Sequence, residues 1–116
     1  PGELGSTFGG GPVACAAGLA VLDAIESEKL IENALYLESV AHQMLITGPV
    51  SSVRGYGLLL GLETTVPART VTRFLFENKI LAGTSADPHV VRLMPPLTIG
   101  EKELEKLATV LAKFPV

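Results

Sequence analysis

The spacing of apolar side chains predicts two helices in the first half of the chain. In the segment 12–26, small and apolar residues such as Val13 and Ala17 recur at three- and four-residue steps. Pro12 suits the first position of a helix, where its missing N–H would have no partner in any case. The segment 31–45 then sets apolar positions against polar ones and predicts an amphipathic second helix.

Two short runs in the next segment are typical of strands. They cover residues 51–54 and 58–63, with Gly55 and Gly57 between them. Glycines between two such runs predict a bend or a bulge. Further along, Pro67 opens a helix that the pattern extends to Asn78.

The last third of the chain predicts two more strands and a terminal helix. The strands are expected over 80–84 and 90–94, separated by a turn at Asp87 and Pro88. Thr98 before Glu101 resembles a capping box, and a stripe of leucines follows it. The order helix, helix, strand, strand, helix, strand, strand, helix predicts an α+β fold, with helices covering one face of a small, largely antiparallel sheet.

Composition excludes several classes of protein. The 116 residues are 47% hydrophobic and 18% charged, with 9 Lys and Arg against 12 Asp and Glu. A chain of this kind is neither disordered nor suited to nucleic acid. Its long uncharged stretches contain Gly and Pro and do not predict a membrane span. Cys15 is a single cysteine and no signal peptide is evident, so we expect no disulfide framework, no membrane partner and a cytoplasmic location.

The beginning of the chain looks like a cut end. Pro1 stands in place of Met, and the sequence enters a glycine-rich loop with no preceding strand or helix. The high apolar content agrees with this expectation, because a piece of a larger body exposes surface that once faced the rest.

The loop before the first helix is a candidate anion site. Ser6 and Thr7 stand among glycines directly before Pro12. Free N–H groups at a helix start and nearby hydroxyls can bind phosphate, and glycine allows a ligand to approach the backbone. There is no Lys-Ser or Lys-Thr signature of a P-loop, so the pattern alone favours a simple loop and leaves phosphate contact as the alternative.

The glycines at 55, 57 and 61 imitate a dinucleotide-binding fingerprint. That fingerprint needs a strand before it and a helix after it, whereas the residues from Leu58 to Glu63 continue as a strand. The pattern therefore favours a hairpin.

Arg92 is the second candidate for chemistry. It lies between apolar strand residues and the prolines at 95 and 96. The pattern favours a solvent-facing or structurally paired charge, and the planar fork of arginine offers carboxylate binding as the alternative. No pattern decides between pairing and a site role for Arg54.

The remaining polar residues give no metal or nucleophile signal. His42, His89 and Cys15 lack the spacing of metal ligands, and Cys15 among alanines is typical of a small core residue. The lysines stand at polar helix ends or faces, so none is expected to form a Schiff base. We predict no metal and no catalytic residue within this chain.

Taken together, the motifs GSTFGGGPVACAAGLAVLDAIE, VRGYGLLLGLE and VVRLMPPLTIGEKELEKL resemble the C-terminal part of class III (ornithine-type) pyridoxal-phosphate aminotransferases, most of all those that use acetylornithine. The resemblance covers essentially the whole chain. It implies that residues 1–28 form a cofactor-phosphate loop and a helix linking two domains. Residues 29–116 are implied to form the C-terminal small domain.

The resemblance also implies roles for individual residues. Thr7, with Ser6 beside it, matches the hydroxyl that bonds the cofactor phosphate of the neighbouring subunit, which implies a homodimer. Arg92 matches the arginine that holds the substrate α-carboxylate. Gly11 departs from the family, which usually has Asn or another polar residue there, while Gly55 and Gly57 match a structural turn.

The implied reaction moves an amino group between N-acetylornithine, or a similar ω-amino compound, and 2-oxoglutarate, a step of arginine biosynthesis. In the family the Schiff-base lysine, the acidic partner of the pyridine nitrogen and the stacking aromatic ring all precede this segment. We therefore expect the isolated chain to be inactive and not to retain pyridoxal phosphate. The alternatives are a free-standing α+β interaction module without a cofactor and a small phosphate-binding protein.

Overall fold

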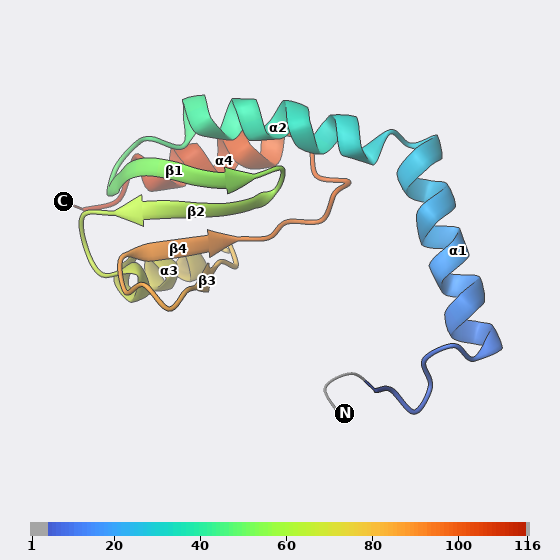
Figure 1. Cartoon of the computed structure of the whole chain (residues 1–116). Helices are drawn as coiled ribbons and strands as arrows, with labels where there is room; N and C mark the ends of the chain where they lie inside the picture. The colour runs from blue at the N-terminus through green and yellow to red at the C-terminus, as the bar shows by residue number, and fades with distance from the viewer. Residues whose placement is uncertain (1–4, 116) are drawn as a thin grey trace.

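The computed structural model describes residues 5–115, so the expected cut end at Pro1 lies outside the described residues. The elements follow the predicted order (Figure 1). The helices are α1 (Pro12–Ser27), α2 (Leu30–Met44), α3 (Ala68–Glu77) and α4 (Glu101–Leu111), and the strands are β1 (Val50–Tyr56), β2 (Leu59–Thr64), β3 (Gly83–Thr84) and β4 (Val90–Leu93).

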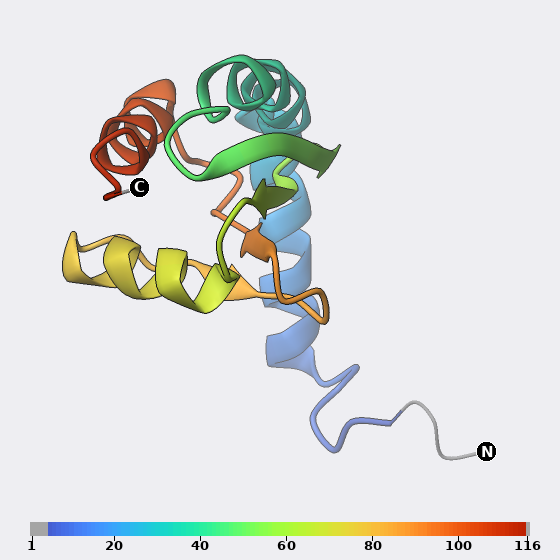
Figure 2. The same ribbon diagram turned by 90° about the vertical axis from the view of Figure 1, so that its left-hand side faces the viewer.

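The strands form one antiparallel sheet. Their order is β1-β2-β4-β3, and each neighbouring pair runs in opposite directions. Helices α2, α3 and α4 gather on one side of this sheet, as Figure 2 shows. We call that side the helix-covered face and the other side the open face. The predicted α+β fold with helices on one face of an antiparallel sheet is confirmed.

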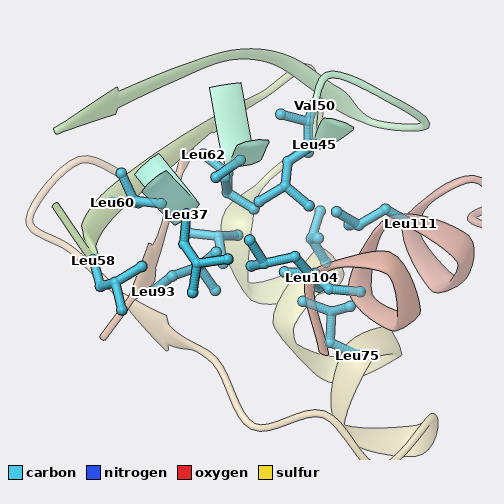
Figure 3. Close-up of a cluster of buried hydrophobic side chains, with 14 of the residues drawn as sticks. Leu37, Leu45, Val50, Leu58, Leu60, Leu62, Leu75, Leu93, Leu104 and Leu111 are labelled. Atoms are coloured by element: carbon cyan, nitrogen blue, oxygen red, sulfur yellow. The ribbon is translucent and has the colours of Figure 1, made fainter. Parts of the chain in front are cut away.

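Alternation along the strands decides which side chains form the core. On β2 and β4 the pairs Leu60 with Leu93 and Leu62 with Val91 lie opposite each other, and all four side chains are buried. Leucines and other apolar residues at three- and four-residue steps on the helices meet them in one cluster (Figure 3). The helix residues of that cluster are Ala34, Leu37, Ala41, Ala68, Val71, Leu75, Leu104, Leu107 and Leu111.

Helix α1 stands apart from this core. It has no buried residue, and it extends away from the end of α2 (Figure 1). Val13 and Leu19 are 84% and 63% exposed. The predicted division between residues 28 and 29 coincides with a bend at Lys29, whose φ is +52, and it stays a prediction as a domain boundary.

Hydrogen bonds from α2 hold the segment that joins β4 to α4. The side-chain amide of Asn33 donates to the carbonyl oxygens of Leu97 and Ile99 at 2.8 and 3.0 Å. The Tyr36 hydroxyl donates to Oε2 of Glu101 at 2.6 Å, and this hydrogen bond is the largest cause of a raised pKa at Tyr36. These contacts fix where the chain leaves β4 after Arg92.

The predicted capping box at Thr98 is wrong by two residues. The helix begins at Glu101 with Gly100 as its N-cap, and the backbone N–H of Gly100 donates to the carboxylate of Glu103 at 3.0 Å. Glycine has no side chain, so only this half of a capping box exists. The amide of Ile99 already donates to the carbonyl of Pro96, a turn that delays the helix.

Two strand features also differ in detail from the prediction. The bend at the glycines is confirmed, because Tyr56 pairs with Leu59 across a two-residue turn that starts at Gly57, with φ +54. The register irregularity, however, lies near Val50. Only two residues of the predicted strand 80–84 pair with β4, because the N–H of Ile80 still donates to a carbonyl of α3.

Candidate functional site

One row of the open face alternates arginine and glycine across all four strands. Arg54 of β1 lies opposite Gly61 of β2, Gly61 lies opposite Arg92 of β4, and Arg92 lies opposite Gly83 of β3. Residues directly opposite each other in antiparallel strands project to the same face. The two arginines therefore share the open face, with one glycine between them.

Arg92 projects to solvent because its strand neighbours project to the core. Val91 and Leu93 are buried on the helix-covered face, whereas Arg92 is exposed. Within residues 5–115, ion pairs are formed by Arg54 and Arg73 and none by Arg92. Of the alternatives that the sequence leaves open, the structural pair is not observed among these residues, and the guanidinium is available to an anion.

Arg54 forms ion pairs with two carboxylates. Its Nη1 lies 3.1 Å from Oε1 of Glu63, and its Nη2 lies 3.8 Å from Oδ2 of Asp87. The hydroxyl of Ser52 donates to the other oxygen of Glu63 at 2.6 Å. Arg54, whose role no sequence pattern decides, thus pairs structurally. Among the described residues, this leaves Arg92 as the cation of the row without a carboxylate partner.

The two arginines border one shallow hollow of about 390 Å³ on the open face. Its other walls are the β1–β2 hairpin and Ser85. The lining residues are Arg54, Gly55, Tyr56, Leu59, Leu60, Gly61, Ser85, Val90 and Arg92. An exposed guanidinium beside apolar hairpin residues suits a ligand with one carboxylate and a short carbon chain.

Arg92 also borders a second groove, on its other side. This groove, of about 660 Å³, lies between the end of α3, β3 and α4, and its walls are mainly apolar. Leu81 and Met94 contribute to it and are 87% and 67% exposed. The guanidinium is thus the polar point between two largely apolar depressions.

The glycine-rich loop before α1 presents both of its hydroxyl residues to solvent. Ser6 Oγ accepts a hydrogen bond from the N–H of Gly9 at 3.1 Å, which folds the loop back on itself. Thr7 is exposed, and α1 has no side-chain cap at Gly11. An uncapped helix start beside exposed hydroxyls fits a phosphate group, because its N–H groups point outward and the helix dipole favours an anion.

The structure does not bring this loop together with Arg92. The loop lies at the end of α1 that is remote from the sheet (Figure 1). Within one copy of the chain, Ser6 and Thr7 therefore cannot act on the same small molecule as Arg92.

The other residues weighed from the sequence are dispersed over the surface. Within residues 5–115 no group of three or more His, Cys, Asp or Glu side chains is placed to hold a metal ion. Cys15 is exposed, which corrects the expectation of a core residue and follows from α1 having no covering layer. The exposed lysines are Lys29, Lys79, Lys102, Lys106 and Lys113.

Sequence reasoning did not find the part that Gly61 and Gly83 play beside Arg92. They are 31 and 9 residues away by their numbering, and only strand register makes them neighbours. The sequence does show a glycine within each of these two predicted strands, Gly61 and Gly83. It does not show which arginine would lie beside it.

Comparison with known proteins decides the family. The model of the family "Aminotransferase class-III" matches residues 1–114. The chain belongs to the class III aminotransferases. It is 40% identical to acetylornithine aminotransferase 1 of Bordetella parapertussis over 116 aligned positions, which cover 96% of this chain and 29% of that protein. The chain therefore spans less than a third of the length of this relative.

Solved structures of class III aminotransferases share its fold. The acetylornithine aminotransferase of Elizabethkingia anophelis superposes with a TM-score of 0.81 at 36% identity, covering 97% of this chain and 30% of that one. The ornithine aminotransferase of Toxoplasma gondii, described with partial occupancy of pyridoxal phosphate at its active site, gives 0.79 at 33% identity, covering 97% and 29%. Pyridoxal phosphate is the cofactor of the family.

The comparisons also show which part of these enzymes the chain matches. The chain matches the C-terminal part of class III aminotransferase structures, the part that the sequence motifs indicated. Within residues 5–115 no helix has the length and apolar character needed to cross a membrane.

Proposed function

We propose that this chain is the C-terminal part of an aminotransferase that moves an amino group between N-acetylornithine, or a similar ω-amino compound, and 2-oxoglutarate. Arg92 binds the substrate carboxylate in this proposal. Thr7, with Ser6, contacts the cofactor phosphate of a neighbouring subunit. The enzyme is proposed to be a cytoplasmic homodimer of arginine biosynthesis.

The observation that carries the proposal is the exposed guanidinium of Arg92, which has no ion partner within residues 5–115. A planar fork of N–H donors binds a carboxylate through two parallel hydrogen bonds and fixes its orientation. Arg54, the other arginine of the row, has Glu63 and Asp87 as partners, so it does not compete for the substrate. Both the amino donor and the oxo acid carry a carboxylate, so one arginine can serve both halves of the exchange.

The loop before α1 supports the proposed phosphate contact. Its hydroxyls and the uncapped helix start offer several donors to an anion. The loop lies far from Arg92 within one chain (Figure 1). This supports a contact with the cofactor phosphate of a second subunit, which is the basis for the proposed homodimer. When bound, pyridoxal phosphate supplies the electron sink for amino transfer. The residues of this chain bind and orient the substrate carboxylate and the cofactor phosphate.

The lysines support the proposal that the isolated chain is inactive. None of them lines the hollow shared by Arg54 and Arg92. Two of them, Lys79 and Lys106, border the apolar groove and are exposed, so neither lies in the enclosed apolar pocket that can activate a lysine nucleophile. The nucleophilic lysine is therefore proposed to lie in a longer protein.

The test begins with the DNA upstream of Pro1 and expression of the complete reading frame. We expect an upstream segment that contains lysine, a visible absorption band of bound cofactor, and amino transfer to 2-oxoglutarate. Donors to compare are N-acetylornithine, ornithine, succinylornithine and 4-aminobutyrate. The 116-residue chain alone is the control and should show neither property. A stop codon directly before Pro1 would support the free-standing module instead.

A further inference from the structure

Gly83 has no backbone reason to be glycine. Its φ lies outside the left-handed region, so any L residue could adopt its conformation. It stands in the short edge strand β3, where glycine weakens pairing and β-branched residues are favoured. Its identity therefore calls for an explanation in the space above it.

That space is occupied by Arg92. A Cβ on Gly83 would lie 3.5 Å from Nε and 3.5 Å from Nη2 of Arg92. These are ordinary van der Waals distances, so a methyl group would just fit. A side chain with γ atoms would extend one bond farther, into the position of the guanidinium.

On the opposite side of Arg92, other side chains lie above the neighbouring glycine. Gly61 lies there, and a Cβ on it would be 3.0 Å from Cγ1 of Val90 and 3.5 and 3.6 Å from Cγ and Nε of Arg54. Arg54 is held over Gly61 by its ion pairs with Glu63 and Asp87. Each arginine of the row thus lies beside its own glycine, Arg54 at Gly61 and Arg92 at Gly83.

We propose that Gly83 is a positioning residue for carboxylate recognition. By lacking a side chain it lets the guanidinium of Arg92 lie against β3, between the two depressions, with its outer N–H groups directed to the substrate. This inference rests on the proposed function of Arg92. It adds that the amino acid and the oxo acid depend equally on Gly83, because both use the same fork.

The test uses the complete enzyme and four single variants, of which three probe β3 and the fourth is Arg92→Ala. Gly83→Ala adds only a methyl group, which fits, and should raise KM less than Gly83→Val does. Gly83→Val should raise the KM for 2-oxoglutarate and for the amino donor about 10-fold with a smaller change in kcat, below the ~100-fold that a 1 Å misplacement can cost. Thr84→Val is the matched control, since Thr84 is exposed, lies in the same strand and pairs with Val91 on the other face.

A binding measurement separates positioning from a general loss of fold. Succinate, a dicarboxylate that cannot accept an amino group, is titrated calorimetrically into each variant with cofactor bound. Gly83→Val should weaken succinate binding in the parent background and have no further effect in Arg92→Ala, because residues that act through one another are not additive. Cofactor affinity and the unfolding temperature are measured in parallel.

The outcomes distinguish this inference from the function on which it rests. If Arg92→Ala leaves succinate binding unchanged, the carboxylate role of Arg92 fails and Gly83 fails with it. If Arg92→Ala weakens binding but Gly83→Val matches Thr84→Val, only the inference on Gly83 is wrong. An equal effect of Gly83→Val in both backgrounds would also overturn it, since the residue would then act through the fold.

Discussion

Arg54 of β1 reaches across β2 to Asp87 in the turn before β4, with 3.8 Å between Nη2 and Oδ2. The same guanidinium lies 3.1 Å from Glu63 on the intervening strand. One side chain therefore joins three segments of the open face, and only Gly61 separates it from Arg92 in the row. Arg54 thus has a structural role, whereas within residues 5–115 Arg92 has no ion partner and can bind an anion.

The Arg54 pairs should contribute little to stability. Their side chains are about half exposed, and exposed ion pairs contribute about 0.2–1 kcal/mol and weaken with salt. We expect Arg54→Met to lower the free energy of unfolding of the chain by less than about 1 kcal/mol, and by less still at about 1 M salt. Arg73→Met, which removes the more exposed pair with Glu77, is the control. A loss above about 2 kcal/mol in urea unfolding would contradict this.

Arg92→Ala in the complete enzyme should impair substrate use and spare the cofactor. Hydrogen bonds to charged groups contribute about 1.5–3 kcal/mol, so we expect KM for 2-oxoglutarate and for the amino donor to rise about 10- to 100-fold. Arg92→Lys keeps the charge but loses the planar guanidinium, so its KM values should lie between those of the parent enzyme and those of Arg92→Ala. Arg69→Ala, an exposed arginine of α3 outside the hollow, should have no effect. Equal loss of cofactor and substrate affinity would remove the carboxylate role.

Thr7→Val should reduce the affinity of the complete enzyme for pyridoxal phosphate. Loss of one hydrogen bond to a charged phosphate corresponds to about 1.5 kcal/mol, or about 10-fold in the dissociation constant. Thr7→Ser restores the hydroxyl and should recover most of the affinity. The control is Thr70→Val, since Thr70 is exposed on α3. Unchanged cofactor binding in Thr7→Val would exclude this threonine from the phosphate site.

Tyr36 should titrate at a higher pH than an ordinary tyrosine. Its hydroxyl donates to the Glu101 carboxylate, and this hydrogen bond, followed by the negative charge, raises the pKa of Tyr36. A raised pKa in the folded state stabilises the fold below the unfolded pKa, about 10, and the contribution is lost as the pH rises through the folded pKa.

The measurement uses Tyr56→Phe, which leaves Tyr36 as the only tyrosine of the chain. Tyrosinate absorbance followed against pH reports the pKa of Tyr36 directly. Adding Glu101→Gln should lower that pKa toward its ordinary value. If the midpoint does not move, the hydrogen bond between α2 and α4 is absent in solution.

Two glycine substitutions should change stability in opposite directions. Gly48 has φ +56, and a Cβ there would overlap the carbonyl oxygen of Leu111, so Gly48→Ala should destabilise the chain by more than about 1 kcal/mol. Gly18 lies inside α1, and a Cβ on it would meet no atom within 4 Å, so Gly18→Ala should stabilise the helix by about 0.5–1 kcal/mol. Thermal unfolding of the 116-residue chain measures both. Equal effects would contradict the assigned conformations.

Residue order along the chain was enough to predict the elements and the family. Local periodicity predicts a helix or a strand without knowledge of its neighbours, which is why the order of elements and the position of Arg92 in a strand were correct. Linear motifs such as VVRLMPPLTIG carried the resemblance for the same reason, since they depend only on residue order. Thr98 shows the limit, because either of two nearby positions could have begun the terminal helix and a turn at Pro96 decided it.

The residues that surround Arg92 follow from strand pairing in the folded chain and could not be predicted from residue order. Strand register placed Gly61 and Gly83 on either side of it, and a shift of one residue would have turned different side chains to the open face. The ion partners of Arg54 come from another strand and from a turn. The sequence shows each of these residues, but their contacts depend on pairings between distant segments, which burial of the leucine core on the other face holds in register.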